Sequence, residues 1–300
     1  MHEINKPSIH KTVLVQEVLA YLDPQPDKVY VDVTFGGGGH TRAILQHEPR
    51  CKVIGIDWDA QSLETYGPSM QEEFGDRFSY IWGNFGHIYR LLKKVGIKKV
   101  DGILADFGTS QIQIIERAGF SIYRDTPLDM RMSAGHQRTT AEYVVNKEPE
   151  EKLADIFFHY GEERQAKKIA RLIVQERKLK KITTTKQLAE LIERILPKHP
   201  GIKIHPATKV FQALRIYVNR ELDNIISFLA AAPTLITPGG RLVCISFHSL
   251  EDRLVKQTFK EYEDLGKAKV LTKKVVAATQ EEVQRNPSSR SAKLRAIQVL

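Results

Sequence analysis

The stretch Val29-Tyr-Val-Asp-Val-Thr-Phe-Gly-Gly-Gly-Gly-His40 organises the rest of the sequence. It opens with β-branched and aromatic residues, which predict a short buried strand with Asp32 inside it. Four glycines follow at once, and glycine adopts the positive φ angles that a sharp turn from a strand into a helix requires. Glycine loops of this kind hold nucleotide-like ligands at the carboxyl end of a parallel sheet. We therefore expect residues 36–40 to form the floor of a ligand pocket.

Strand and helix patterns alternate on both sides of this stretch. A doubly wound, mostly parallel α/β sheet is the architecture that such an alternation predicts. The expected helices lie at residues 10–22, 41–46 and 86–95, and the further strands lie at residues 52–57, 78–85 (with the exit loop) and 100–106.

The alternation stops at about residue 114, where helical patterns begin and no convincing strand is found up to residue 206. A helical insertion in the sheet explains this change, and the insertion is expected to recognise the substrate. We divide the chain into a first part of the sheet domain at 1–113, an all-helical domain at 114–215 and a second part of the sheet domain at 216–300. The expected helices are 149–160, 162–178, 185–196, 206–229 and 250–262 (with Ser249 as its N-cap), and the closing strands are 239–247, 269–276 and 294–300.

The spacing of acidic residues favours a ligand that contains a ribose. Asp57 follows a buried strand and lies 21 residues after Gly36, the spacing at which a carboxylate accepts both ribose hydroxyls, although Asp57 could also cap a helix. Thr41 stands where the dinucleotide fingerprint has its third glycine, which disfavours a nicotinamide-dependent oxidoreductase. S-adenosylmethionine has a ribose and no pyrophosphate, and its positive charges would favour carboxylates such as Asp32 or Asp106.

Composition and charge narrow the class of protein further. The chain has 300 residues and a net charge of +9, and residues 266–300 carry eight Lys/Arg against two Glu. Such a basic segment is typical of phosphate contact or of a solvated tail. No apolar run is long enough to cross a membrane and no signal region is seen, so we expect a cytoplasmic protein without membrane contact. Cys51 and Cys244 lie in apolar runs and are expected to be reduced and buried, and no metal site is expected.

Many ordered motifs give the sequence a specific resemblance that covers nearly its whole length. The chain resembles the RsmH (MraW) family, the bacterial 16S ribosomal RNA cytosine-N4 methyltransferases. The motifs are His10-Lys-Thr-Val-Leu, Asp32-Val-Thr-Phe-Gly-Gly-Gly-Gly-His40, Gly55-Ile-Asp57, Gly83-Asn-Phe85, Val100-Asp-Gly-Ile-Leu-Ala-Asp106, Gly119-Phe-Ser121, Pro127-Leu-Asp-Met-Arg-Met132, Tyr160-Gly-Glu-Glu-Arg164, Phe211-Gln-Ala-Leu-Arg-Ile216, Val218-Asn-Arg-Glu-Leu222, Ser246-Phe-His-Ser-Leu-Glu-Asp-Arg253 and Arg290-Ser-Ala-Lys-Leu-Arg295.

The resemblance implies a class I, Rossmann-like methyltransferase fold with a helical insertion. It implies methyl transfer from S-adenosylmethionine to N4 of a cytosine in the decoding centre, the P-site region, of 16S rRNA in the small (30S) ribosomal subunit. The glutamine that the family uses falls on Gln113 or, because the segment before Gly119 is one residue short, on Gln111. Carried over by position, the cofactor contacts are Gly38, Gly39, His40, Asp57, Phe85, Asp106 and Gln113.

Other roles stay open at the level of sequence. Asp106 could accept the hydrogens of the cytosine amino group as a catalytic residue, or serve only the cofactor. Candidates for RNA phosphate contacts are Arg290, Lys293 and Arg295. The sequence is also compatible with an amino-methyltransferase acting on another RNA or on DNA, or with a non-catalytic RNA-binding protein. It does not fix the oligomeric state, so a homodimer is an open alternative to a monomer.

Overall fold

The computed structural model describes residues 11–108, 118–196 and 205–300. The chain divides into two compact units, of which the first comprises Met1–Gly108 and Leu222–Leu300 and the second comprises Thr109–Glu221. The boundaries expected from the sequence lay at 113/114, which is outside the described residues, and at 215/216; residues 216–221 belong to the helical unit instead. The shift at the second boundary has a physical reason: Val218 packs in the same core as Val210, Phe211 and Leu214, which belong to the helical unit.

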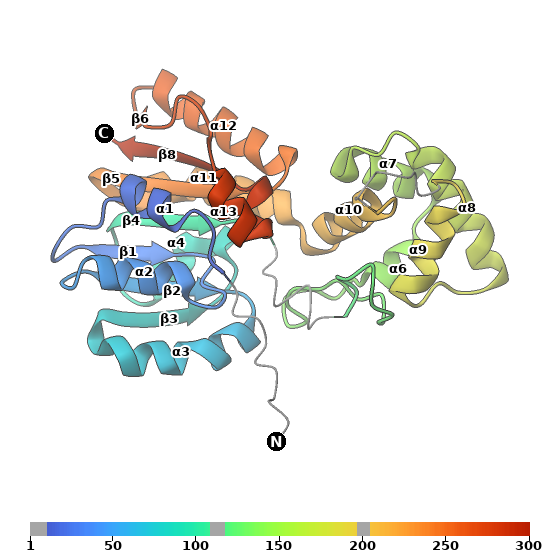
Figure 1. The fold of residues 1–300 in the computed structure, drawn as a ribbon, viewed down its shortest axis with the longest axis horizontal. Helices are drawn as coiled ribbons and strands as arrows, with labels where there is room; N and C mark the ends of the chain where they lie inside the picture. The colour runs from blue at the N-terminus through green and yellow to red at the C-terminus, as the bar shows by residue number, and fades with distance from the viewer. Residues whose placement is uncertain (1–10, 109–117, 197–204) are drawn as a thin grey trace. The chain divides into compact units, whose positions relative to one another are not determined.

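The first unit is built on one sheet with strand order β3-β2-β1-β4-β5-β8-β6 and with β7 paired to β8 (Figure 1). Pairing is parallel from β3 through β5, and β8 runs antiparallel to β5, β6 and β7. The expected mostly parallel sheet is therefore confirmed. Its strands are β1 Val29–Asp32, β2 Lys52–Asp57, β3 Phe78–Trp82, β4 Val100–Asp106, β5 Ile236–Ser246, β6 Ala268–Val270, β7 Val276–Ala277 and β8 Lys293–Val299.

Helices cover both faces of this sheet because successive strand residues point to opposite sides. On one face, Val31 packs with residues of α4, α11 and α12. On the other face, Tyr30 packs with residues of α1, α2 and α3. The helical elements of the unit are α1 Val15–Leu22, α2 Gly39–His47, α3 Ala60–Phe74, η1 Gly75–Arg77, η2 Phe85–His87, α4 Ile88–Lys94, α11 Glu221–Leu235, α12 Ser249–Asp264, α13 Gln280–Arg285 and η3 Pro287–Ser291.

The second unit is helical in its described part and has a core of its own. Buried residues of its helices, among them Phe157, Ile173 and Leu214, form one continuous apolar cluster. Its helices are α6 Ala141–Lys147, α7 Glu150–Gly161, α8 Ala166–Leu179, α9 Thr185–Glu193 and α10 Thr208–Asn219.

Several expected elements differ from the structure, and the differences in three of them have a local cause or change the number of elements. The first helix begins at Val15 because Leu14 has a φ of +52° and its N–H donates to the Glu282 carboxylate. The long helix expected at 206–229 is two helices, α10 and α11, separated at Arg220, whose φ is +51°. The strand expected at 269–276 is the two short strands β6 and β7.

Both cysteines are free and buried, as expected. Burial raises the pKa of the Cys51 thiol to about 11 and that of Cys244 well above its usual value. Both side chains therefore stay protonated and act as small apolar residues of the core. Among the described residues, no helix is both long and apolar enough to cross a membrane.

Candidate functional site at the carboxyl edge of the sheet

The glycine turn connects the end of β1 to the start of α2. Gly36 and Gly38 have φ angles of +52° and +76°, so these two positions require glycine. The φ of Gly37 is not positive, so the backbone conformation does not require glycine there. A Cβ on Gly39 would lie 1.8 Å from Thr12 Oγ1, so the chain approaches this glycine closely. The turn thus leaves no room for a side chain at Gly39, where Thr12 packs.

Asp57 ends β2 beside this turn, and its carboxylate is bound to backbone on both sides. Oδ2 accepts the N–H of Gly36 at 2.7 Å and Oδ1 accepts the N–H of Asp59 at 2.9 Å. Burial raises the pKa of Asp57 to about 7, and these two hydrogen bonds lower it less than burial raises it. Asp59, not Asp57, is the N-cap of α3. A carboxylate that keeps free lone pairs at this edge can accept two vicinal hydroxyl groups.

Asp106 ends β4, next to the start of α2, and faces His40. The Nε2 atom of His40 lies 3.5 Å from Oδ2 of Asp106, and the exposed fractions of the two side chains are 5% and 19%. Three buried atoms here, both ring nitrogens of His40 and Oδ1 of Asp106, make no hydrogen bond within the described part of the chain. Buried polar atoms are rarely left without a partner in native proteins. Their clustering indicates a site that a polar ligand completes.

Asp32 is wholly buried behind this pair. Its Oδ2 accepts the hydroxyl of Thr41 at 2.8 Å, and its Oδ1 accepts the backbone N–H of Thr34 at 3.2 Å. Burial raises the pKa of Asp32, while His40 and the Thr41 hydroxyl oppose that rise. Because only 1% of Asp32 is exposed, its carboxylate does not form part of the open surface of the site.

Phe85 follows β3 at the same edge. Its ring is half-buried and packs on Phe107 and Phe228, with ring centroids 5.7 Å apart in both pairs. The neighbouring Asn84 side chain accepts the N–H of Gly86 and so fixes the turn that carries Phe85. Gln113 and its alternative Gln111 lie outside the described residues.

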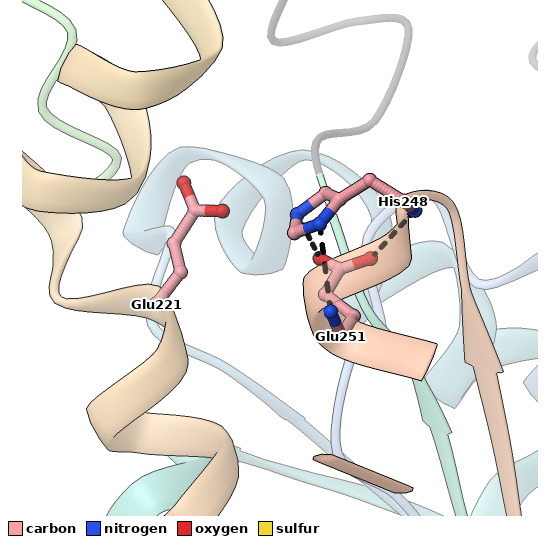
Figure 2. A group of neighbouring side chains, drawn as sticks. All are labelled: Glu221, His248 and Glu251. Carbon is pink, nitrogen blue, oxygen red and sulfur yellow. Dashed lines mark hydrogen bonds and ion pairs between the residues drawn. The ribbon is translucent and has the colours of Figure 1, made fainter. Parts of the chain in front are cut away.

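The end of β5 carries His248, which is the N-cap of α12; the sequence suggested Ser249 instead. Figure 2 shows the His248 ring directed at Glu251, with Nε2 at 3.1 Å from the Glu251 carboxylate. The other oxygen of Glu251 accepts the backbone N–H of Phe247 and of His248. His248 thus takes part in a capping box with Glu251, and its buried Nε2 atom makes no hydrogen bond within the described residues. Glu221, also drawn in Figure 2, binds Arg215 through two hydrogen bonds.

The candidate RNA contacts differ in their surroundings. Arg290 is exposed in η3 and Lys293 is half-buried at the start of β8. Arg295 donates two hydrogen bonds to the Asp252 carboxylate, and only 11% of its side chain is exposed. Arg290 and Lys293 are thus available to a phosphate, whereas the charge of Arg295 is already balanced.

Within the helical unit, several charged residues of the recognised motifs serve the unit itself. Arg131 forms two hydrogen bonds with the Asp129 carboxylate. Asn219 is buried, accepts the N–H of Met132 and donates to the carbonyl of Met130. Arg164 is exposed. Asp129 and Arg131 therefore form an ion pair within the helical unit.

These residues fit S-adenosylmethionine, the cofactor that the sequence predicts. The glycine turn offers close backbone, Asp57 offers an acceptor for ribose hydroxyls, and Asp106 and His40 offer three buried polar atoms that lack a hydrogen bond. The carboxylates of Asp57 and Asp106 at this edge also favour a cationic ligand. The residues that sequence reasoning missed are Thr34, whose hydroxyl accepts the backbone N–H of Asp106, and Thr41, whose hydroxyl donates to Asp32. Only the tertiary structure reveals these contacts.

Comparison with known proteins agrees with the motifs. Residues 7–300 match the model of the MraW methylase family. Ribosomal RNA small subunit methyltransferase H of Thermotoga neapolitana is 47% identical over 296 residues, which cover 97% of this chain and 96% of that protein. The protein of the same name from a Cyanothece species is 46% identical over 299 residues, which cover 99% of this chain and 97% of that protein. Among solved structures, an rRNA methylase from Streptococcus thermophilus covers 98% of this chain and 99% of that chain, with 10% identity and a TM-score of 0.44. The chain therefore belongs to the MraW methylase family.

Proposed function

We propose that this protein transfers a methyl group from S-adenosylmethionine to N4 of a cytosine in the decoding centre, the P-site region, of 16S rRNA. The substrate is the RNA of the small ribosomal subunit, which places the reaction in the cytoplasm. The observation that carries this proposal is the nearly full-length match to relatives that are named ribosomal RNA small subunit methyltransferase H. The polar atoms at the carboxyl edge of the sheet support the choice of cofactor, because they fit a cationic nucleoside ligand.

The cofactor contacts that we propose lie along one edge of the first unit. Gly38, Gly39 and His40 begin α2, and Asp57 ends β2 with lone pairs directed beyond its two backbone donors. Phe85 offers a half-buried ring beside the exit of β3. When bound, S-adenosylmethionine supplies an electrophilic methyl group on a sulfonium. The chain's own residues bind it, orient it and exclude water around it.

We assign Asp106 the role of accepting hydrogen bonds from the cytosine amino group. The amino nitrogen is a weak nucleophile because its lone pair is delocalised into the ring, and an acceptor on its hydrogens localises the lone pair toward the methyl group. Asp106 is suited to this role because it is the partly exposed carboxylate of the site and its Oδ1 has no hydrogen bond within the described residues.

The test of this role is Asp106→Ala, with cofactor affinity and turnover measured separately. We expect turnover of bound substrate to fall by roughly 10²-fold or more, since general acid–base groups contribute about 10²–10⁴-fold. A variant that loses only cofactor affinity and keeps its turnover at saturation would refute the catalytic role and leave Asp106 a cofactor residue.

For RNA we propose Arg290 and Lys293 as phosphate contacts, with Arg295 holding the end of β8 to α12 through Asp252. The proposal as a whole is tested by transfer of a tritiated methyl group to three substrates: 30S particles that lack the modification, naked 16S rRNA and DNA. We expect label in ribosomal RNA. Label in DNA alone would favour a DNA amino-methyltransferase, and binding of RNA without S-adenosylmethionine binding would favour a non-catalytic RNA-binding protein.

A further inference from the structure

Asp106 has a neighbour from each of two other segments of the chain, Thr34 and His40. Its backbone N–H donates to Oγ1 of Thr34 at 2.7 Å, and its Oδ2 faces Nε2 of His40 at 3.5 Å. Thr34 comes from the loop after β1, and His40 comes from the first turn of α2. The loop after β1 therefore fixes the backbone of Asp106, and its carboxylate lies beside the first turn of α2.

A second layer, formed by Asp32, ties these two segments together. Oδ1 of Asp32 accepts the N–H of Thr34 at 3.2 Å, and the Thr34 hydroxyl lies 3.5 Å from the same oxygen. Because that hydroxyl already accepts the N–H of Asp106, its own hydrogen is free to point at Asp32. Oδ2 of Asp32 accepts the hydroxyl of Thr41, the residue next to His40. One buried carboxylate thus orients both the threonine and the helix turn that flank Asp106.

Asp32 is more deeply buried than either Asp106 or His40. Asp106 is 19% exposed, whereas His40 is 5% exposed and Asp32 is 1% exposed. A buried carboxylate is costly unless hydrogen bonds satisfy it, and a site whose inner shell is locked by outer hydrogen bonds holds its geometry better. The cost of burying Asp32 is therefore consistent with a role in holding the site.

We propose that Thr34 is a positioning residue that holds Asp106 against the reacting amino group, and that Asp32 holds both Thr34 and the first turn of α2 in place. This inference rests on the proposed function for the identity of the amino group. It explains why an acidic residue lies inside β1 although its side chain is hidden from ligands.

The test compares two threonines that make the same kind of hydrogen bond in different places. Thr34→Val removes the acceptor of the Asp106 N–H. Thr272→Val is the matched control, because the buried Thr272 hydroxyl accepts the N–H of Ala296 at 2.9 Å where the chain runs beside β8. We expect both variants to lower the melting temperature, whereas only Thr34→Val lowers turnover, by about 10-fold or more, since small misplacements of reacting groups cost up to ~10²-fold. Thr34→Ser, which keeps the hydroxyl, should restore most of the turnover.

A double-mutant cycle with Asp106→Asn separates positioning from general destabilisation. We follow turnover and, by calorimetry, the affinity for S-adenosylhomocysteine. The cycle then has a readout whether Asp106 affects turnover or cofactor affinity. We expect Thr34→Val to cost less than ~2-fold in both quantities once Asp106 is replaced, while its cost in melting temperature stays the same.

The inference is overturned if Thr34→Val and Thr272→Val have equal turnover, or if the costs of Thr34→Val and Asp106→Asn are additive in both turnover and affinity. Failure of the proposed function looks different. In that case the wild-type protein transfers no methyl group to small-subunit particles. The double-mutant cycle, measured as affinity for S-adenosylhomocysteine, still decides whether Thr34 acts through Asp106.

Discussion

At the scale of single residues, Asp57 makes the site sensitive to pH. Its pKa is raised to about 7 by burial, from an ordinary value of 3.8. Near neutrality a sizeable fraction of the protein therefore carries a proton on this carboxyl group. Hydroxyl groups that donate to a carboxylate favour its ionised form, so a ribose bound at Asp57 lowers the pKa of Asp57 and releases the proton.

We therefore expect the affinity for S-adenosylhomocysteine to rise with pH from about 6 to about 8. Below the free-protein pKa the gain approaches roughly 10-fold per pH unit, and above it the affinity levels off. Calorimetry in buffers of different ionisation enthalpy measures both the affinity and the proton release. Asp57→Asn should bind weakly without this pH dependence; a wild-type affinity that is constant across the range would contradict the assignment of Asp57 to the ribose.

At the scale of elements, the turn between β1 and α2 depends on close contact with the segment before α1. A Cβ on Gly39 would lie 1.8 Å from Oγ1 of Thr12, although the φ of Gly39 itself is not positive. Gly39→Ala should therefore lower stability through this clash, by about 1–3 kcal/mol, the usual cost of overpacking. It should also weaken cofactor binding, because α2 begins at this residue.

The compensating change is Thr12→Ala, which removes the Oγ1 and Cγ2 atoms that the new methyl group would meet. The pair Gly39→Ala with Thr12→Ala should recover most of the melting temperature lost in Gly39→Ala alone. If the double variant is no more stable than Gly39→Ala, the clash with Thr12 is not the reason that glycine occupies this position.

The sequence predicted the elements best where an apolar run is unbroken. The strands β2 and β4 begin and end at the residues expected, because both faces of a central parallel strand are buried and the apolar run has sharp ends. The break at Arg220 was not predicted, since an arginine with positive φ has no sequence signal. The start of α1 was also missed, because it depends on Glu282, which lies 268 residues away.

The candidate site follows the same division between local and long-range information. The role of Asp57 was predicted from its spacing to the glycines. The glycine turn was predicted because glycine adopts the positive φ angles that the turn requires. Thr34 was not found, because its hydroxyl matters only through the end of β4, whose pairing with β1 brings Leu104 beside Asp32. The N-cap of α12 was assigned to Ser249 because serine is a common cap, whereas the partner Glu251 selects His248.

At the scale of the whole molecule, the helical unit interrupts the sheet without disturbing it. β4 and β5 pair in parallel, with Asp106 opposite Ile245, although the whole second unit lies between them in the chain. The second unit has its own apolar core, so its residues need not be held by the sheet to stay folded. This organisation keeps the carboxyl edge of β4, with Asp106, on a rigid strand.

The positive charge of the whole chain predicts salt-dependent binding to its substrate. With a net charge of +9, binding of small-subunit particles should weaken steeply as salt increases. Arg290→Ala and Lys293→Ala should each reduce the slope of log affinity against log salt by roughly 1. Lys260→Ala is the control, because Lys260 already pairs with Asp264 on α12. If all three variants keep the wild-type slope, Arg290 and Lys293 do not contact phosphate.

We propose that the protein methylates the exocyclic nitrogen of a cytosine in 16S rRNA with the site at the carboxyl edge of its sheet. The most direct measurement is methyl transfer from labelled S-adenosylmethionine to 30S particles that lack the modification, followed by nuclease digestion and mass spectrometry of the labelled nucleoside and its position. We expect an N4-methylated cytidine at one site in the decoding centre, and we expect this product to be absent with the Asp106→Ala variant. Label on a ring carbon, on another base, or undiminished in Asp106→Ala would contradict it.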